Sequence, residues 1–292
     1  MVTGFLLIDK PPGATSHDAV AAVRRLVGQK KVGHAGTLDP MATGLLVLGL
    51  GRATRLLRFV ADAPKTYVAR ALFGVATDTL DADGAVLERS PMPVSEDEVA
   101  AAAARFVGHI HQVPPMVSAL KVGGRRLYEL ARDGVTVERE ARPVTIHELE
   151  IVDFAPCDYP EVTFRVRCSS GTYVRTLADD LAASLGGRAH LTELRRMAIG
   201  SLVVDDAVDL EELARLVEAG RAPVLEPAAA LADLPAATVG EDAAVAVCHG
   251  VVFPAAAFGA VEGSFRVLDG DGRLLAVYAV EGRRARPEVV LG

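Results

Sequence analysis

The segment 33–44, GHAGTLDPMATG, combines three glycines with a single carboxylate and a histidine five residues before it. Glycine gives the backbone freedom, and Pro40 disfavours a helical conformation at Asp39, so we expect a rigid loop that presents this carboxylate. Asp39 could act there as a nucleophile or a general base, or it could bond its own backbone as a turn residue. The segment is not a Walker loop, because its last glycine is not followed by Lys and Ser or Thr.

A second motif, CSSGTYVRTL at 168–177, lies where a predicted strand ends and a helix begins. Such a junction is a natural anion-binding site, and Arg175 falls in the first turn of the helix. The alternative is that Arg175 pairs with Asp179, four residues later, on a solvated surface. A third motif places Lys65 and Tyr67 on one predicted strand, where the alternative for the tyrosine is simple packing in the core.

The acidic segment 77–84, TDTLDADG, has some features of a calcium-binding loop. The hand-type calcium loop needs acids or amides at positions 79, 81 and 83 and a glutamate at position 90, but Thr79 and Ser90 break the pattern. We therefore expect a polar turn whose Asp side chains bond the backbone. Three widely spaced cysteines favour a reducing compartment, and neither they nor the seven histidines have metal-ligand spacing.

Hydrophobic periodicity and turn signals predict the elements that position these motifs. We expect strands at 5–8, 65–73, 144–154 and 162–168. We expect helices at 18–27 with Ser16 as the cap, from the Ser95 capping box to Gly108, at 173–185 and at 191–197. Strands and helices mix without a regular βαβ alternation, which favours an α+β fold over a doubly wound sheet.

The composition changes after about residue 225. The stretches PAAA at 227–230 and LPAA at 234–237 are typical of a linker. Beyond them, strand-like 264–268, the turn DGDG at 269–272 and strand-like 274–280 predict a β-hairpin. We therefore place a small all-β domain at 235–292.

The overall composition fits about two globular domains in 292 residues, with a net charge of −7. The charge is uneven: residues 1–60 hold eight Lys and Arg against three Asp, whereas 201–292 carry a net charge of −8. A polyanionic partner or ordinary solvated helix faces would each explain the basic segment. No apolar run approaches the roughly 20 residues that span a bilayer, and no signal peptide is recognisable, so we expect a cytoplasmic protein without membrane association.

Eight motifs follow one another along residues 4–200: IDKPPG at 8–13, GHAGTLDPMATGLL at 33–46, KTYVA at 65–69, TDTLDADG at 77–84, SALKVGGRRLYELAR at 118–132, EARPV at 140–144, CSSGTYVRTLADDL at 168–181 and HLTELRR at 190–196. In this order they resemble the TruB family of bacterial tRNA pseudouridine-55 synthases. The resemblance implies that the protein isomerises U55 in the T-loop of tRNA to pseudouridine. It implies no metal, no organic cofactor and no obligate protein partner, and a monomer.

The resemblance also implies the pseudouridine synthase fold, with a mixed, largely antiparallel central sheet flanked by helices. We expect a catalytic domain at 1–230 with a thumb-like RNA-binding insertion at about 113–142, followed by a small β-rich, PUA-like domain at 235–292. The acidic charge of that last domain is unusual for a surface that grips RNA.

Three residues match the family's catalytic positions: Asp39, Tyr67 and Arg175. Asp39 would attack C1′ of the uridine covalently or remove a proton from C2′ to form a glycal, and the sequence leaves both routes open. Arg175 would pair with Asp39, and Tyr67 would stack on the base and help the final proton removal from C5.

The target base lies inside the folded T-loop, so it must be flipped into the pocket. By resemblance, His34 packs against the flipped nucleotides, and Leu194 and Tyr173 line the pocket. Seven cations are expected phosphate contacts: Lys10, Lys65, Lys121, Arg125, Arg126, Arg195 and Arg196. A second hypothesis is a non-catalytic RNA-binding module that helps tRNA fold, and the set of Asp39, Tyr67 and Arg175 favours the enzyme.

Overall fold

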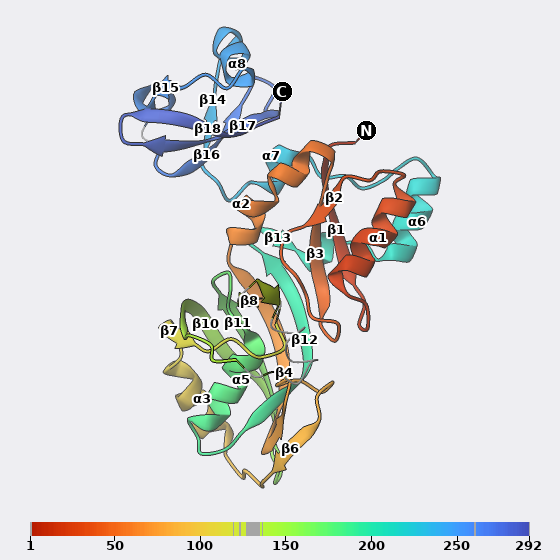
Figure 1. The fold of residues 1–292 in the computed structure, drawn as a ribbon, viewed down its shortest axis with the longest axis vertical. Helices are drawn as coiled ribbons and strands as arrows, with labels where there is room; N and C mark the ends of the chain where they lie inside the picture. Colours follow the sequence, from red (N-terminus) through yellow and green to blue (C-terminus); the bar gives the residue numbers. More distant parts are fainter. Residues whose placement is uncertain are drawn as a thin grey trace. The chain divides into compact units, whose positions relative to one another are not determined.

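The computed structural model describes residues 2–118, 120–122, 124–126, 135, 137–259 and 261–291 (Figure 1). The protein has the predicted α+β fold, with helices packed on largely antiparallel strands. The chain divides into two compact units. The first comprises Met1–Pro40, Gly44–Ala63 and Ala198–Gly292, and the second comprises Met41–Thr43 and Pro64–Met197.

Three strands and two helices build the centre of the first unit: β1 (Gly4–Lys10), β2 (Val32–His34), β3 (Thr43–Leu50), α1 (Ser16–Leu26) and α6 (Leu210–Glu218). Strand β3 pairs antiparallel with both β1 and β2, and Lys10 at the end of β1 lies opposite Gly44. The two helices pack together beside these strands (Figure 1). Their apolar faces and the strands form one buried core, which includes Ile8, Val23, Leu48 and Leu213. Burial of this apolar surface fixes the elements that flank Asp39.

Helix α1 is capped by Thr15 rather than by Ser16. The Thr15 hydroxyl accepts a hydrogen bond from Asp18 N (3.1 Å), and Asp18 Oδ2 accepts one from Thr15 N (2.9 Å). The prediction of Ser16 as the cap is wrong, because Thr15 offers the same hydroxyl chemistry three residues before an acid. Ser16 is instead the first residue of the helix and is fully buried.

The remaining short elements of the first unit are η1 (Gly51–Arg55), α2 (Leu57–Asp62), β13 (Leu202–Val203), η2 (Val204–Asp206) and α7 (Pro227–Ala230). The stretch predicted as linker at 227–230 is thus a short helix, which begins with a proline at a position where no backbone N–H is needed.

Five strands lie side by side in the second unit, in the order β12 (Ala189–Ile199), β4 (Lys65–Phe73), β11 (Glu161–Cys168), β10 (Arg142–Ala155) and β7 (Gly108–Gln112). Helix α3 (Glu96–Ala104) contacts β10, helix α5 (Val174–Ala183) contacts β4, and the two helices contact each other (Figure 1). They therefore cover one face of these strands. Two short hairpins complete the unit: β5 (Val75–Thr77) with β6 (Val86–Arg89), and β8 (Lys121–Val122) with β9 (Arg125–Arg126).

Two predictions for this unit are wrong. Residues 191–197, predicted as helical, lie in the long strand β12, because pairing with β4 overrides a local pattern in which Leu191 and Leu194 have helical spacing. Helix α3 ends at Ala104, and Gly108, predicted as its end, is the first residue of β7.

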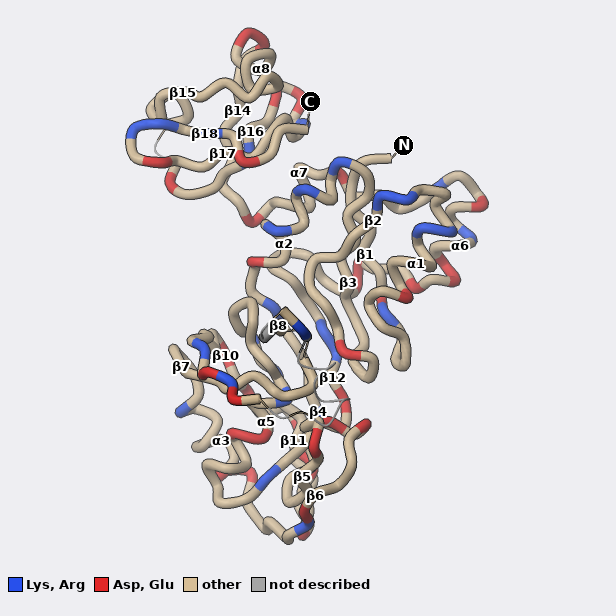
Figure 2. The backbone as a smooth tube through the Cα atoms, viewed as in Figure 1, with Lys and Arg blue, Asp and Glu red and all other residues tan. Residues whose placement is uncertain are grey.

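Residues 236–290 form a five-stranded sheet in the order β14 (Ala236–Thr238), β16 (Ser264–Leu268), β17 (Leu274–Glu281), β18 (Arg284–Val290) and β15 (Phe253–Pro254). The predicted hairpin is confirmed, and Asp269 closes its turn by accepting bonds from Asp271 N and Arg273 N. The segment is β-rich but not all-β, because it contains helix α8 (Glu241–Cys248) and the short η3 (Ala255–Phe258). Its basic and acidic residues are interspersed along the chain (Figure 2).

Three arginines of η1 and α2 bind the last strand. Arg52 Nη1 donates to Leu291 O (2.6 Å), Arg55 Nη1 donates to Val290 O (2.8 Å), and Arg58 Nη2 lies 3.0 Å from Glu288 Oε1. Part of the positive charge counted in residues 1–60 is therefore directed to acceptors of the protein itself. Among the described residues, no helix is long and apolar enough to cross a membrane.

Candidate active site

The loop that carries Asp39 is held on both sides by the turn between β1 and α1. On one side, Ser16 Oγ accepts a hydrogen bond from Leu38 N (2.9 Å) and donates one to Leu38 O (3.2 Å). On the other side, Pro40 O accepts hydrogen bonds from Gly13 N (2.8 Å) and Lys10 Nζ (3.3 Å). Asp39 itself is half-buried. The neighbours of the carboxylate-bearing residue are thus fixed by main-chain bonds, as the sequence predicts for a rigid loop.

Lys10 is a structural residue of this loop. Its side chain is 0% exposed, and its ammonium also donates to Pro11 O (2.8 Å) and Ala14 O (2.7 Å). A buried ammonium is stable only where acceptors replace its water, and the carbonyl groups do so here. The prediction that Lys10 contacts phosphate is wrong, because its charged group does not reach the surface.

Two further predicted residues lie near the ends of the same loop. His34, the last residue of β2, is half-buried and meets the His17 ring edge-on, with 5.7 Å between the ring centroids. Thr43, after Asp39 in the chain, accepts a hydrogen bond from Arg195 Nη1 on β12 (3.4 Å). Arg195 is half-buried, so its predicted contact with phosphate stays a prediction.

Arg175 lies in the first turn of α5 and is 3% exposed. Its Nη1 donates to Asp81 Oδ2 (3.1 Å) and Thr79 O (2.8 Å), and its Nη2 donates to Val117 O (2.8 Å). The alternative of a solvated pair with Asp179 is wrong, because Asp179 accepts two hydrogen bonds from Arg188 instead (2.8 and 2.7 Å). The predicted pairing of Arg175 with Asp39 stays a prediction.

Asp81 is a functional candidate that the sequence analysis missed. The predicted polar turn at 77–84 is confirmed: Asp81 Oδ1 accepts hydrogen bonds from Thr79 Oγ1 (2.5 Å) and Asp83 N (3.2 Å). Its other oxygen, Oδ2, binds the guanidinium of Arg175, which lies far later in the sequence, on α5. The local pattern could reveal the turn, but nothing in it points to a partner 94 residues away.

Tyr67 and Lys65 are buried on the same face of β4. In the register with β11, Tyr67 lies opposite Val166, and Lys65 lies opposite Cys168. Burial raises the pKa of the Cys168 thiol to about 11, against the opposing effects of a Thr172 hydrogen bond and the Lys65 charge. The thiol is therefore protonated at neutral pH and is a packing residue.

The buried positions of Lys65 and Arg196 contradict their predicted contacts with phosphate. Lys65 faces the interior from β4, and Arg196 is among the largest fully buried side chains of the protein. Leu194, two residues before Arg196 on β12, is also buried, and its predicted role as a pocket wall stays a prediction.

Tyr173 is half-buried at the N-cap of α5. Its main chain is bound by the side chain of Gln112, which accepts from Tyr173 N (3.0 Å) and donates to Tyr173 O (3.3 Å). The predicted pocket residue Tyr173 and the catalytic candidate Arg175 therefore begin the same helix. The motif at 168–177 predicts both residues at this junction, but no local signal in the sequence points to Gln112.

The predicted insertion at about 113–142 leaves the sheet at β7 and returns at β10, where Gln112 lies opposite Arg142. Within it, β8 and β9 pair as a hairpin, and Arg125 is exposed. The side chains of Lys121 and Arg126 lie outside what the structure describes, so their predicted contacts stay predictions. Arg139 Nη1 donates to Pro114 O (2.8 Å) and so connects the two ends of the insertion.

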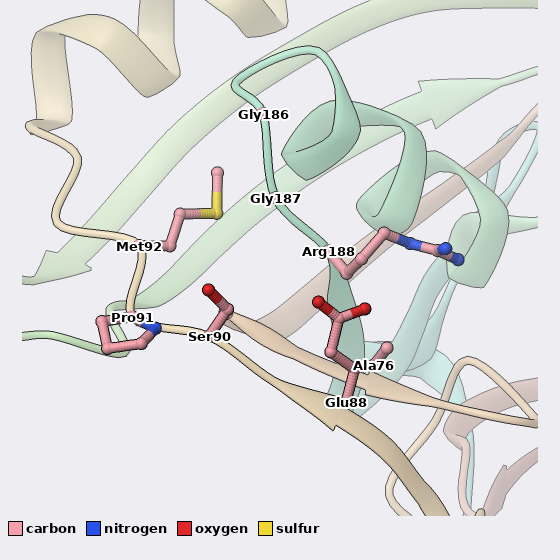
Figure 3. Close-up of a pocket in the computed structure, with 9 residues that line it drawn as sticks. Ala76, Glu88, Ser90, Pro91, Met92, Gly186, Gly187 and Arg188 are labelled. Carbon is pink, nitrogen blue, oxygen red and sulfur yellow. The ribbon is translucent and has the colours of Figure 1, made fainter.

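A cavity of about 290 Å³ lies elsewhere in the second unit, beside the glycine turn that follows α5 (Figure 3). Met92 and Glu88 line it, and the Arg188 guanidinium is directed toward α5, where it binds Asp179. None of the predicted site residues whose side chains the structure describes lines this cavity. In the described ranges, no three His, Cys, Asp or Glu side chains gather as a metal-binding group.

Two family models match the chain in succession. Residues 24–174 match the N-terminal domain of the TruB family pseudouridylate synthases, and residues 175–231 match the C-terminal domain of tRNA pseudouridylate synthase B. The first match covers more than half of the chain and includes Asp39, Tyr67 and Asp81. The α+β fold and these matches define a pseudouridine synthase, which is an isomerase. The chain belongs to the TruB family.

Full-length relatives support this assignment. The tRNA pseudouridine synthase B of Symbiobacterium thermophilum is 54% identical over 86% of this chain and 83% of its own. That of Thermobifida fusca is 46% identical over 99% of both chains. Among solved structures, a chain from a Cbf5-Nop10-Gar1 complex matches with a TM-score of 0.76 and 26% identity, over 98% of this chain and 83% of that chain.

Proposed function

We propose that this protein converts uridine 55 in the T-loop of tRNA to pseudouridine, in the cytoplasm and as a monomer without an obligate protein partner. The observation that carries the proposal is the Asp39 loop, whose flanking residues Leu38 and Pro40 are held by four hydrogen bonds with residues 10–16 of the first unit. The names of the relatives, tRNA pseudouridine synthase B, supply the substrate.

The reaction breaks the bond between N1 of the uracil and C1′ of the ribose, turns the base and joins C5 to C1′. The proton on C5 then leaves, and N1 takes up a proton. Asp39 serves as the carboxylate in either of two routes, attack on C1′ or removal of a proton from C2′. Arg175 pairs with Asp39, and Tyr67 stacks on the base and assists the removal of the C5 proton. An electropositive site favours the ionised carboxylate that both routes require.

The substrate enters as a flipped nucleotide, because the target base is stacked inside the T-loop. We propose that His34 packs against the flipped nucleotides and that Tyr173 and Leu194 line the pocket. Arg125 is exposed and Arg195 is half-buried, and we propose that both contact phosphate groups of the RNA. The insertion at 113–142 holds the RNA, and phosphate contacts of this kind position the substrate without reading its sequence.

A second candidate function is assistance to tRNA folding through binding alone. It uses the same basic surface but has no need for a carboxylate in an electropositive site. The two functions separate at Asp39. We expect Asp39→Asn to abolish turnover while it leaves the affinity for tRNA within about tenfold, or 1.4 kcal/mol.

The test measures pseudouridine in an unmodified T-arm stem-loop by mass spectrometry after cyanoethylation, in the presence of EDTA. Wild type, Asp39→Asn and the exposed-carboxylate control Asp153→Asn are compared. Product from wild type and Asp153→Asn only would support the enzyme with Asp39 as its carboxylate. Tight RNA binding without product from wild type would refute the proposed reaction and favour the folding factor, and weak binding by Asp39→Asn would assign a structural role to Asp39.

A further inference from the structure

Gln112 lies where the end of β7 meets the start of α5, and no local sequence pattern predicts this contact. It is the last residue of β7, and it lies opposite Arg142 where the chain returns to the sheet after the insertion. Its side chain is 1% exposed. A buried amide must find partners for both its carbonyl oxygen and its NH2 group, so the partners of Gln112 indicate what it holds in place.

Both partners of Gln112 belong to the main chain of Tyr173. The amide oxygen accepts from Tyr173 N (3.0 Å), and the amide nitrogen donates to Tyr173 O (3.3 Å). Tyr173 is the N-cap of α5, and its own side chain makes no capping bond. Gln112 therefore fixes the peptide from which the helix starts, two residues before Arg175.

Two further contacts join the segment after Gln112 to the same helical turn. Val117 O accepts from Arg175 Nη2 (2.8 Å), and Val113 O lies 3.5 Å from Thr176 Oγ1. The segment 112–117 thus runs along the first turn of α5. These bonds join the base of the predicted insertion to the turn that carries Arg175, and Gln112 supplies two of them from the end of β7.

We propose that Gln112 is a positioning residue for the isomerisation, which holds the start of α5 so that Tyr173 and Arg175 keep their places at the base of the insertion. The inference rests on the proposed function, which gives these two residues their roles. Gln112 does not touch the substrate. Its loss displaces reacting groups more than it changes the RNA-binding surface, so it lowers the rate of the chemical step rather than the affinity.

The chain contains a matched control. Gln29 is 8% exposed and makes the same two-way bond to the main chain of Val2, which donates to Gln29 Oε1 (2.9 Å) and accepts from Gln29 Nε2 (3.0 Å). Gln29→Leu and Gln112→Leu each remove two bonds between a buried amide and the main chain of one residue, and Gln29→Leu also removes a longer bond to Lys31 O (3.4 Å). Gln112→Asn is a milder variant, because it keeps the amide donor and acceptor on a side chain that is one methylene shorter.

The experiment measures three quantities for the full-length wild type and the three variants. These are the single-turnover rate of pseudouridine formation in the T-arm stem-loop at saturating enzyme, the Kd for that RNA, and hydrogen exchange of the peptide that covers Tyr173. We expect Gln112→Leu to lower the rate by about tenfold or more, with Gln112→Asn between it and wild type. We expect a Kd within roughly threefold of wild type and faster exchange at Tyr173, whereas Gln29→Leu changes neither the rate nor that exchange.

The outcomes separate the inference from the proposed function. If wild type is active and Gln112→Leu is as fast as Gln29→Leu, the positioning role is refuted and the proposed function stands. If Gln112→Leu loses affinity in proportion to rate, Gln112 supports RNA binding and the inference is also refuted. If wild type forms no pseudouridine, the proposed function fails and the positioning role falls with it.

Discussion

Ser16→Ala removes the hydroxyl that holds Leu38 immediately before Asp39, while it leaves the volume and the helical backbone of the site nearly unchanged. Two hydrogen bonds are lost, one from Leu38 N (2.9 Å) and one to Leu38 O (3.2 Å). Ser16 is fully buried, so water does not readily replace its oxygen. Thr15 remains as the helix cap, and the substitution therefore tests the loop and not the start of α1.

The magnitude follows from these two bonds. An unpaired buried N–H costs about 1–3 kcal/mol, and loss of the longer bond adds about 0.5–1.5 kcal/mol, so we expect the free energy of unfolding to fall by roughly 2–4 kcal/mol. A displacement of about 1 Å at a reacting group can lower a rate by about a hundredfold. Because Pro40 O keeps its two bonds, we expect a smaller fall in kcat, of about tenfold, with KM nearly constant.

The assay combines urea unfolding followed by circular dichroism with steady-state kinetics on the T-arm stem-loop. Ser184→Ala is the control, because this exposed serine makes a single side-chain bond, to Leu181 O (2.8 Å), at the end of α5. Ser16→Cys, with a weaker donor and acceptor, should fall between wild type and Ser16→Ala. An unchanged kcat in a destabilised Ser16→Ala protein would refute a positioning role for Ser16, since Asp39 would then keep its place without the two Ser16–Leu38 hydrogen bonds.

Two further predictions concern buried and half-buried charges. Asp81→Asn breaks the buried pair with Arg175 (3.1 Å), so we expect the free energy of unfolding in urea to fall by about 3–5 kcal/mol and the single-turnover rate to fall. The exposed Asp83→Asn should change neither quantity, and equal behaviour of the two variants would contradict a special role for the pair. Burial, with the neighbouring Asp179 charge, raises the pKa of Asp180 to about 6, so the native state binds a proton more tightly than the unfolded chain and stability falls as pH rises from about 4 to about 6. Urea midpoints across this range should show the fall in wild type and a weaker one in Asp180→Asn, and identical pH profiles would rule out this source.

The parts of the fold that the sequence predicts well are those set by local chemistry. Strand β11 starts one residue before its predicted start and ends where predicted, because the alternation of apolar and polar residues over 162–167 is a property of the segment itself. The hairpin of β16 and β17 follows from its Asp-Gly turn in the same way. The segment 191–197 fails for the opposite reason: its local pattern is ambiguous, and its pairing with β4 is long-range.

The site shows the same division. The motifs identify Asp39 and Arg175 by residue type, but the partners Ser16, Asp81 and Gln112 come from distant segments with no local signal. The phosphate contacts are predicted least well, because a sequence shows that a side chain is charged but not which way it faces. Three expected RNA-binding cations are buried in the protein: Lys10, Lys65 and Arg196.

The hydrogen bonds that hold the Asp39 loop also affect the conformational entropy that RNA binding costs. The bonds from Ser16, Gly13 and Lys10 order the loop as part of the folded first unit, so its conformational freedom is lost during folding and not when RNA arrives. When the reactive loop is already ordered, less of the binding free energy is lost to ordering it, and more remains for other unfavourable steps of binding. Under the proposed function, this free energy contributes to flipping the stacked base out of the T-loop, so the buried carbonyl contacts of Lys10 affect a step that takes place in the RNA.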